Sequence, residues 1–313
     1  MVVLTIMLAA SFCGAPVWAK YPEKPVKLVI PYSAGGGTDA IGRTLAKVME
    51  KYMDQPIAVE NRTGAGGAIA FAYVAKSKPD GYTLCFEALP IVTLPIFGKV
   101  KVSYKDLDHV AQINEDPASI TIRKDAPWNS MQELIAYAKN NPKKVKVGTT
   151  SPGAAWWIGW QIVKVESGLS GLVTEVPYSG GAKPMLKALA GKEVDVATSS
   201  AAEALTLANE NRIKYLGVMS GQKMDLFKDI PTMKEAGVDV AFGTWRAIAL
   251  AKGTPESIIN FWRDVIKKAV ADEEFINFMK KRKFGIKYRD RPEFMKFMDE
   301  QTELFTRVAK EIK

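Results

Sequence analysis

The sequence has 313 residues, of which 47% are apolar and 25% charged, with a formal net charge of +9. A chain of this length is typical of two packed lobes, each with its own hydrophobic core. Its only histidine is His109 and its two cysteines are Cys13 and Cys85. The sequence therefore lacks the Ser-His-Asp and Cys-His constellations of hydrolases and any histidine or thiolate cluster for zinc. The densest basic run, at 280–283, suits a helix C-terminus. We therefore expect that the protein is not an enzyme, and that it binds no metal, no cofactor and no nucleic acid.

An apolar leader opens the chain. Residues 1–19 carry no charge and end with small residues at the two positions that a signal peptidase reads. Gly14 and Pro16 interrupt the apolar run before it can span a bilayer. We expect a signal peptide cleaved after Ala19 and a periplasmic location, with Cys85 left as a single cysteine that forms no internal disulfide.

The mature chain begins with alternating strand and helix patterns. An apolar run at 26–30 predicts a buried strand, and apolar residues at helical spacing over 41–52 predict the helix after it. Further strands are predicted at 57–59 and 82–86, with a helix through Tyr73 between them. Strands separated by single helices indicate βαβ units and a mainly parallel sheet.

The alternation restarts in the second half of the chain. Ser130 and Glu133 form a capping box that opens a helix. Four predicted strands follow, at residues 145–148, 173–177, 194–198 and 214–219. The last part of the chain is helical, with helix starts near Thr254 and Asp290. The fold class is α/β.

These patterns predict two lobes, each a mainly parallel sheet flanked by helices. We expect lobe one to comprise residues 20–122 and 247–313, and lobe two to comprise 123–246. Two short apolar runs, 119–122 and 247–251, are the predicted hinge crossings between the lobes.

A glycine-rich loop joins the first strand to the first helix. Its three consecutive glycines precede Thr38, the predicted N-cap of the helix. Glycines allow close approach to the backbone, and the first N–H groups of a helix lack intrahelical partners, so the loop offers an anion site. An ordinary tight turn is the alternative. The candidate ligand contacts are Tyr32, Ser33, Ala34, Gly35, Gly36, Gly37, Thr38 and Asp39.

A second Pro-Tyr-Ser loop, at 177–181, nearly repeats the first and again lies between a strand and a helix. Loops at the carboxyl ends of parallel strands face the crevice between lobes. The two loops therefore predict a site that holds both ends of one di- or tricarboxylate, with chance similarity between common turns as the alternative. The candidate contacts here are Tyr178, Ser179, Gly180 and Gly181.

Charged and polar residues near strand ends complete the predicted site. Arg246 lies where the chain returns between the lobes, and a guanidinium there can bind a carboxylate through two parallel hydrogen bonds. An interlobe salt bridge is the alternative for this residue. Glu87 and Glu203 are expected near strand ends that face the cleft. If either carboxylate lines the pocket, a simple dianionic ligand fits there less well. Ser200, just beyond the strand at 194–198, is a further candidate contact.

A Rossmann-type NAD(P)-dependent oxidoreductase is the competing interpretation. Gly35, Gly37 and Ala40 fit the dinucleotide pattern G-x-G-x-x-A, and Glu60 ends the next strand where a ribose-binding acid is expected. The leader, the second Pro-Tyr-Ser loop and the lack of a catalytic histidine count against this interpretation.

Five segments carry a family resemblance, at residues 30–39, 60–67, 80–84, 176–182 and 229–237. Together and in this order they resemble the extracytoplasmic solute receptors of tripartite tricarboxylate transporters, also called Bug receptors. The resemblance implies a periplasmic binding protein fold of type II, whose two lobes close on a ligand like a Venus flytrap. It also implies a small carboxylate ligand and integral membrane subunits of a transporter as partners. We expect the receptor to be a monomer.

The resemblance further implies a third binding loop, at 149–157. The contacts carried over are Thr150, Ser151, Ala154 and Trp156. Relatives usually have a glycine-serine pair and a nearby histidine in this loop, whereas this chain has two alanines followed by two tryptophans. The change predicts a ligand that is more apolar or aromatic at one end. Core packing of the tryptophans is the alternative, above all for Trp157.

Overall fold

The computed structural model describes residues 21–98 and 100–311. The predicted signal peptide and its cleavage site after Ala19 lie outside these residues. Among the helices that the structure describes, none combines the length and the apolar character that crossing a membrane requires.

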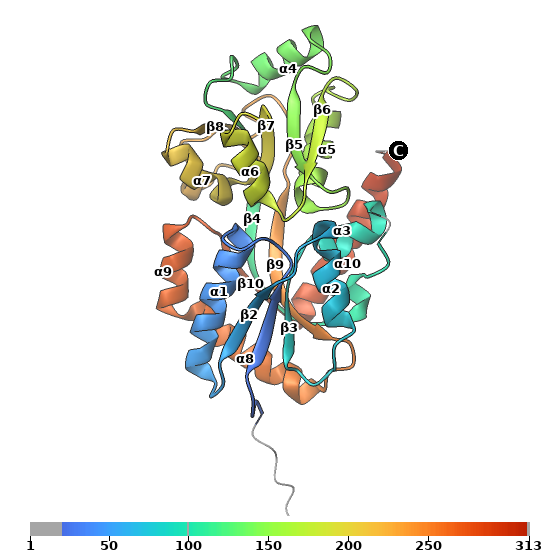
Figure 1. The fold of residues 1–313 in the computed structure, drawn as a ribbon, viewed down its shortest axis with the longest axis vertical. Helices are drawn as coiled ribbons and strands as arrows, with labels where there is room; N and C mark the ends of the chain where they lie inside the picture. Colours follow the sequence, from blue (N-terminus) through green and yellow to red (C-terminus); the bar gives the residue numbers. More distant parts are fainter. Residues whose placement is uncertain (1–20, 99, 312–313) are drawn as a thin grey trace, which may run out of the picture.

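One half of the molecule, at the bottom of Figure 1, is built around a mixed sheet. Its strands are β1 (Val26–Ile30), β2 (Ile57–Asn61), β3 (Thr83–Ala88), β9 (Gly243–Ala251), β10 (Ile286–Asp290) and the first part of β4 (Leu107–Arg123). Strand β1 runs parallel to β2 and β3, as the βαβ pattern predicts. The helices around this sheet are α1 (Gly37–Met49), α2 (Ala68–Ala75), α3 (Pro90–Phe97), α8 (Glu256–Ala271), α9 (Glu273–Lys281) and α10 (Arg291–Glu311).

The other half, at the top of Figure 1, holds a second mixed sheet. Its strands are β5 (Lys146–Thr150), β6 (Thr174–Tyr178), β7 (Val196–Ser200), β8 (Ile213–Val218) and the last part of β4. Its helices are α4 (Met131–Asn140), α5 (Ala155–Glu166), α6 (Ala182–Ala190) and α7 (Ala201–Asn209). The side chain of Ser130 accepts a hydrogen bond from the Glu133 amide at the start of α4, which confirms the predicted cap.

Strand β4 belongs to both sheets, and its partner changes in the middle. Pro117 is the last of its residues opposite β9, and Ala118 is the first opposite β7. The Ala118 amide donates to the carbonyl of Phe242, so the returning chain lies beside the outgoing strand at this point. The chain leaves on β4 and returns on β9, and these strands pair antiparallel in the first sheet. In the second sheet β4 pairs antiparallel with β7 and β8. Both sheets are therefore mixed, where the sequence predicted mainly parallel sheets. The residue bounds of the lobes and the positions of the hinge crossings remain predictions.

Apolar residues at the predicted periods form the core on both sides of the first sheet. In β1, Leu28, Val29 and Ile30 are fully buried, and α1 buries Ile41 and Leu45 against the sheet. Because these residues fix the end of β1 and the start of α1, the glycine loop between them is held by rigid elements. The α/β fold class with two lobes is confirmed.

Candidate functional site

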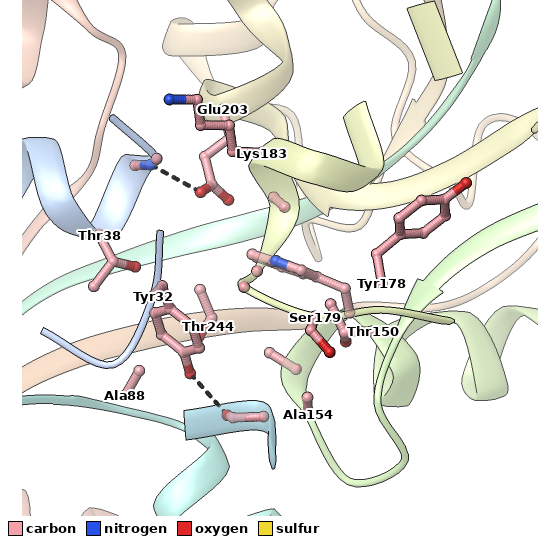
Figure 2. Close-up of a pocket in the computed structure, with 18 of the residues that line it drawn as sticks. Tyr32, Thr38, Ala88, Thr150, Ala154, Tyr178, Ser179, Lys183, Glu203 and Thr244 are labelled. Atoms are coloured by element: carbon pink, nitrogen blue, oxygen red, sulfur yellow. Dashed lines mark hydrogen bonds between the residues drawn. The ribbon is translucent and has the colours of Figure 1, made fainter. Parts of the chain in front are cut away.

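A cavity of about 30 Å³ lies where the two lobes meet. Its walls come from the loops that precede α1, α5 and α6, together with residues of β3, β9 and α7. The sequence-predicted residues that line it are Tyr32, Gly36, Gly37, Thr38, Thr150, Ser151, Ala154, Trp156, Tyr178, Ser179, Gly180, Gly181 and Arg246. Figure 2 shows these groups converging from both lobes. The space holds only a few water molecules, so the structure shows closely apposed lobes.

The first glycine loop delivers the start of α1 to this cavity. The N-cap of α1 is Gly36, which has extended backbone and no side-chain cap. The prediction of Thr38 as N-cap is therefore wrong, because the glycines let the helix begin earlier. The Thr38 hydroxyl instead accepts a hydrogen bond of 2.8 Å from Nε of Arg246. The first amides of α1 are left for groups that enter the cavity from outside the helix.

The helices α5 and α6 begin at the same cavity. Their N-caps, Ala154 and Gly181, also lack side-chain caps. Gly180 and Gly181 have φ values of +94° and +93°, a conformation that side chains disfavour. Three helix N-termini, one from lobe one and two from lobe two, thus point their positive dipole ends at one space. Two of their first-turn amides already have side-chain acceptors, the Gly37 amide with Oε1 of Glu203 at 3.0 Å and the Trp157 amide with Oγ1 of Thr150 at 3.1 Å.

Direct hydrogen bonds join the two Pro-Tyr-Ser loops. The Ser33 amide donates to the carbonyl of Gly180 at 3.1 Å. From α6, Nζ of Lys183 donates to the carbonyl of Ala34 at 2.7 Å. These contacts exist only while the lobes are together.

Arg246 is almost fully buried at the floor of the cavity. Its Nη1 contacts Oδ2 of Asp116 at 2.6 Å and Oδ1 of Asn114 at 3.1 Å. Arg246 thus forms an ion pair, but its partner Asp116 lies on the neighbouring strand β4 of the same sheet, so the pair is not the interlobe salt bridge of the alternative. Arg246 also lines the cavity. Pairing with Asp116 compensates a charge that would otherwise be costly to bury.

Glu203 projects into the cavity from the first turn of α7. Its Oε1 accepts a hydrogen bond of 3.0 Å from the Gly37 amide at the start of α1, as Figure 2 shows. Oxygen Oε2 is buried and has no hydrogen-bond partner among the described residues. Burial of this carboxylate raises the pKa of Glu203 above its ordinary value. The expectation that Glu203 faces the cleft agrees with its place in the cavity wall.

Several predicted contacts lie outside this cavity. Ser33, Ala34 and Gly35 line a larger neighbouring groove on the other side of their loop. Asp39 turns back to accept hydrogen bonds from the Gly35 amide at 2.7 Å and from Arg43 at 2.9 Å. Its carboxylate therefore holds the loop in shape.

Glu87 and Ser200 are also away from the cavity. Glu87 is buried, and its Oε1 lies 2.6 Å from Nδ1 of His109. Ser200 is the N-cap of α7, where its hydroxyl accepts from the Ala202 amide at 3.2 Å. By this cap Ser200 fixes the helix turn that carries Glu203.

The prediction omitted some lining residues. They are Gly66, Ala88, Ala155, Ala182, Lys183 and Thr244. Ala88, Ala155 and Ala182 are direct chain neighbours of predicted residues, and Lys183 and Thr244 lie two residues away, so extending each predicted segment by two residues finds these five. Gly66 lies in a separate glycine turn. The only feature of the sequence that could have predicted its place in the cavity wall is that this turn follows the strand next to the first loop. Of the two tryptophans, Trp156 lines the cavity, while Trp157 packs its ring 5.8 Å from that of Phe97.

The neighbouring groove has a volume of about 810 Å³ and is rich in cations. It is bounded by α6 and α7 of lobe two and by the first glycine loop and the end of α9 in lobe one. Its basic residues are Lys183, Lys187, Arg212, Lys281 and Arg282. It shares Gly36, Gly37, Lys183 and Glu203 with the cavity, so the two spaces adjoin. In the part of the chain that the structure describes, no group of three His, Cys, Asp or Glu residues is placed to hold a metal ion.

Two α/β lobes joined by crossing strands, with a cavity between them, define a periplasmic binding protein. Solved structures agree with this class. The periplasmic binding protein BugD is 27% identical with a TM-score of 0.88, covering 93% of this chain and 98% of its own. A protein of R. palustris solved with adipate is 25% identical with a TM-score of 0.86, covering 93% and 98%.

The chain belongs to the receptor family of tripartite tricarboxylate transporters, whose family model matches residues 41–313. Among relatives, a UPF0065 protein of Bordetella pertussis is 31% identical, with 88% of this chain and 84% of that protein covered. The predicted family is thereby confirmed. Family and fold are those of solute-binding receptors and differ from the oxidoreductase interpretation. The acid of that interpretation, Glu60, pairs with Lys27 at 2.8 Å.

Proposed function

We propose that the protein is an exported, periplasmic, monomeric receptor that closes around a small carboxylate and delivers it to the membrane subunits of a tripartite tricarboxylate-type transporter. The observation that carries this proposal is the convergence of three helix N-termini without side-chain caps, those of α1, α5 and α6, on one interlobe cavity. Amide donors and positive dipole ends favour a negatively charged guest.

Closure is the physical basis of capture in this proposal. Loops of both lobes line the cavity and contact each other directly, with the Ser33 amide donating to the Gly180 carbonyl at 3.1 Å. The lobes therefore have to separate for loading, and a ligand that contacts both loops stabilises the closed form. The family membership supports this, as does the R. palustris neighbour solved with adipate.

The position of each predicted site residue determines its role in the proposal. First-turn amides of α5 and α6 would hold carboxylate oxygens, and Trp156 would pack against the apolar part of the ligand. Arg246 would act mainly by holding Thr38 and the crossing strand, because its Nε and Nη1 are already engaged.

Native mass spectrometry and calorimetry test the proposal. The purified protein should release a small acid on denaturation, and at least one aliphatic or aromatic carboxylate should bind with micromolar or tighter affinity. The matching carboxamides should bind at least about a hundredfold more weakly, because they lose the charge that the helix ends favour. Equal binding of acids and amides, or no binding by any acid, would contradict the proposal.

A further inference from the structure

Glu203 places a negative charge in a cavity that otherwise favours anions. Its Oε1 already occupies the Gly37 amide at the start of α1, with a donor–acceptor distance of 3.0 Å. A Cβ added at Gly37 would lie 2.6 Å from Cγ of Glu203, so the glycine and the acid fit each other. The Gly37 amide at the start of α1 is thus taken. A ligand carboxylate has the first-turn amides of α6 and those of α5 other than the Trp157 amide, which donates to Thr150.

The second carboxylate oxygen of Glu203 needs a partner that the protein does not supply. Oε2 is buried and makes no hydrogen bond of normal geometry with a described residue, although the Ser200 backbone lies close enough to the carboxylate to favour its charged form, which partly offsets the rise in the pKa of Glu203 that burial causes. The two cations that line the cavity make their hydrogen bonds to other groups and none to Oε2. Nζ of Lys183 donates to the carbonyl of Ala34, and Nη1 of Arg246 donates to Asp116. A buried acceptor without a donor is destabilising, and more so when it is charged.

We propose that Glu203 is the specificity-determining residue of this receptor, and that it selects a carboxylate that also carries an ammonium group. The ligand carboxylate lies at the starts of α5 and α6, and its ammonium group donates to Oε2 of Glu203. The inference rests on the proposed function and names the ligand class for the same site. A second ligand carboxylate at the same position would face Glu203 at close range in a poorly solvated space, where like charges repel strongly.

Matched ligand pairs test this inference in the wild-type protein. Calorimetry would compare glutamate with glutarate, aspartate with succinate, and γ-aminobutyrate with butyrate. In at least one pair the amine-bearing member should bind at least about tenfold tighter, as a charge-assisted hydrogen bond to a buried carboxylate provides. Tighter binding by the amine-free members overturns the role of Glu203 while leaving the carboxylate receptor intact. Absence of binding by all six compounds overturns the role of Glu203, and the wider panel of aliphatic and aromatic carboxylates then decides the proposed function.

A variant at position 203 tests whether Glu203 causes the preference for amine-bearing ligands. Glu203→Gln keeps an oxygen for the Gly37 amide and turns the second position into a donor, so the preference for the amine should fall below about threefold. Glu210→Gln, which removes an exposed charge at the end of the same helix, should leave the preference unchanged. Circular dichroism confirms folding of both variants. A preference that survives Glu203→Gln in a folded protein overturns the inference, and the wild-type pairs decide if that variant does not fold.

Discussion

Gly180 carries the closest contact between the two Pro-Tyr-Ser loops. Its φ of +94° disfavours any other residue, and a Cβ added to it would lie 2.3 Å from Oγ of Ser33. Gly171, in a loop of the same lobe, has a similar φ of +77° but nothing within 4 Å of an added Cβ. A side chain at either glycine would strain the backbone, but only a side chain at Gly180 would also crowd the contact between the lobes. Comparing the two variants therefore distinguishes the effect of strain from the effect of crowding.

We expect Gly180→Ala to weaken ligand binding by at least about tenfold, because the methyl group keeps the loops apart in the closed form. Both Gly180→Ala and Gly171→Ala should lower the free energy of unfolding by about 1–2 kcal/mol, the cost of a side chain at positive φ. Urea denaturation measures the second effect and calorimetry with the tightest carboxylate the first. Equal affinities of the two variants would show that the contact does not contribute to closure.

Predictions for single residues succeeded where a local pattern sets the geometry. The glycine loops can be recognised in the sequence because a positive φ and close approach of the backbone require glycine. The structure brings Gly36 and Gly180, one from each loop, to one cavity. Side-chain direction has no such local signal. Asp39 turns toward the Gly35 amide and Glu87 toward His109, contacts that depend on packing.

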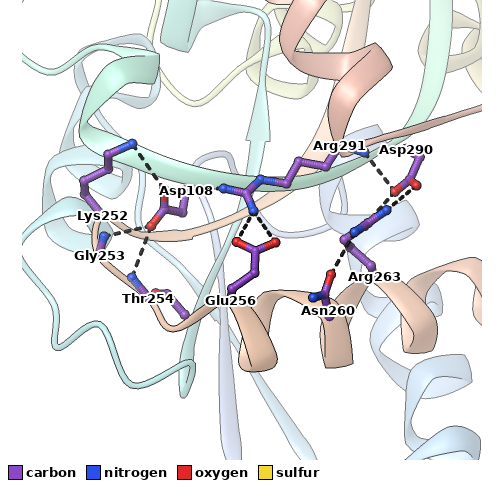
Figure 3. Close-up of polar contacts among 9 residues, drawn as sticks. All are labelled: Asp108, Lys252, Gly253, Thr254, Glu256, Asn260, Arg263, Asp290 and Arg291. Atoms are coloured by element: carbon purple, nitrogen blue, oxygen red, sulfur yellow. Dashed lines mark hydrogen bonds and ion pairs between the residues drawn. The ribbon is translucent and has the colours of Figure 1, made fainter.

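At the scale of elements, the periodic strands and helices were predictable and the crossing strand was not. Strand β4 covers Leu107–Arg123, whereas the sequence indicated only a short apolar run at 119–122 in this region. The other predicted crossing, at 247–251, lies in β9. The beginning of β4 is fixed by Asp108, whose Oδ2 accepts from the Gly253 amide at 2.7 Å and the Thr254 amide at 3.1 Å (Figure 3). These partners lie more than a hundred residues away in sequence, so spacing alone gives no indication of the bond.

The same strand carries a buried ion pair beneath α10. His109 lies 2.6 Å from Glu87 through Nδ1 and 2.7 Å from the carbonyl of Tyr104 through Nε2. Both partners are acceptors, so a doubly protonated imidazole satisfies them. Burial alone would lower the pKa of His109, but the charge and hydrogen bond of Glu87 and the Tyr104 carbonyl outweigh it and raise the pKa.

This pair predicts a stability that declines as pH rises. The folded pKa of His109 lies above the unfolded value of about 6.5, so the stabilisation is complete below about pH 6.5 and is lost as pH rises through the folded pKa. His109→Gln should cost about 3–5 kcal/mol at low pH, because it leaves Glu87 unpaired. Urea denaturation of both proteins across this range measures the difference, which should shrink toward high pH. A difference independent of pH would contradict the assignment.

At the scale of the whole molecule, the two lobes build the basic groove together. Lys183, Lys187 and Arg212 come from lobe two, and Lys281 and Arg282 from the end of α9 in lobe one. The groove adjoins the cavity, so its field acts on an anion that approaches the site. A fold-level pattern predicts the two lobes, but the groove depends on their relative placement, which no sequence pattern specifies.

The groove should speed ligand capture more than it strengthens binding. Lys187 and Arg212 are exposed and lie outside the cavity wall, so replacing both by glutamate should lower the association rate of an anionic ligand by about tenfold while changing its dissociation rate little. Stopped-flow measurement of the protein's tryptophan fluorescence follows binding, since Trp156 lines the cavity. The control replaces Lys234 and Lys296, which lie outside both the cavity wall and the groove wall, by glutamate with the same change of net charge. High salt should remove the difference between wild type and the groove variant, because it screens exposed charges. If both double variants slow association equally, net charge and not the groove governs capture.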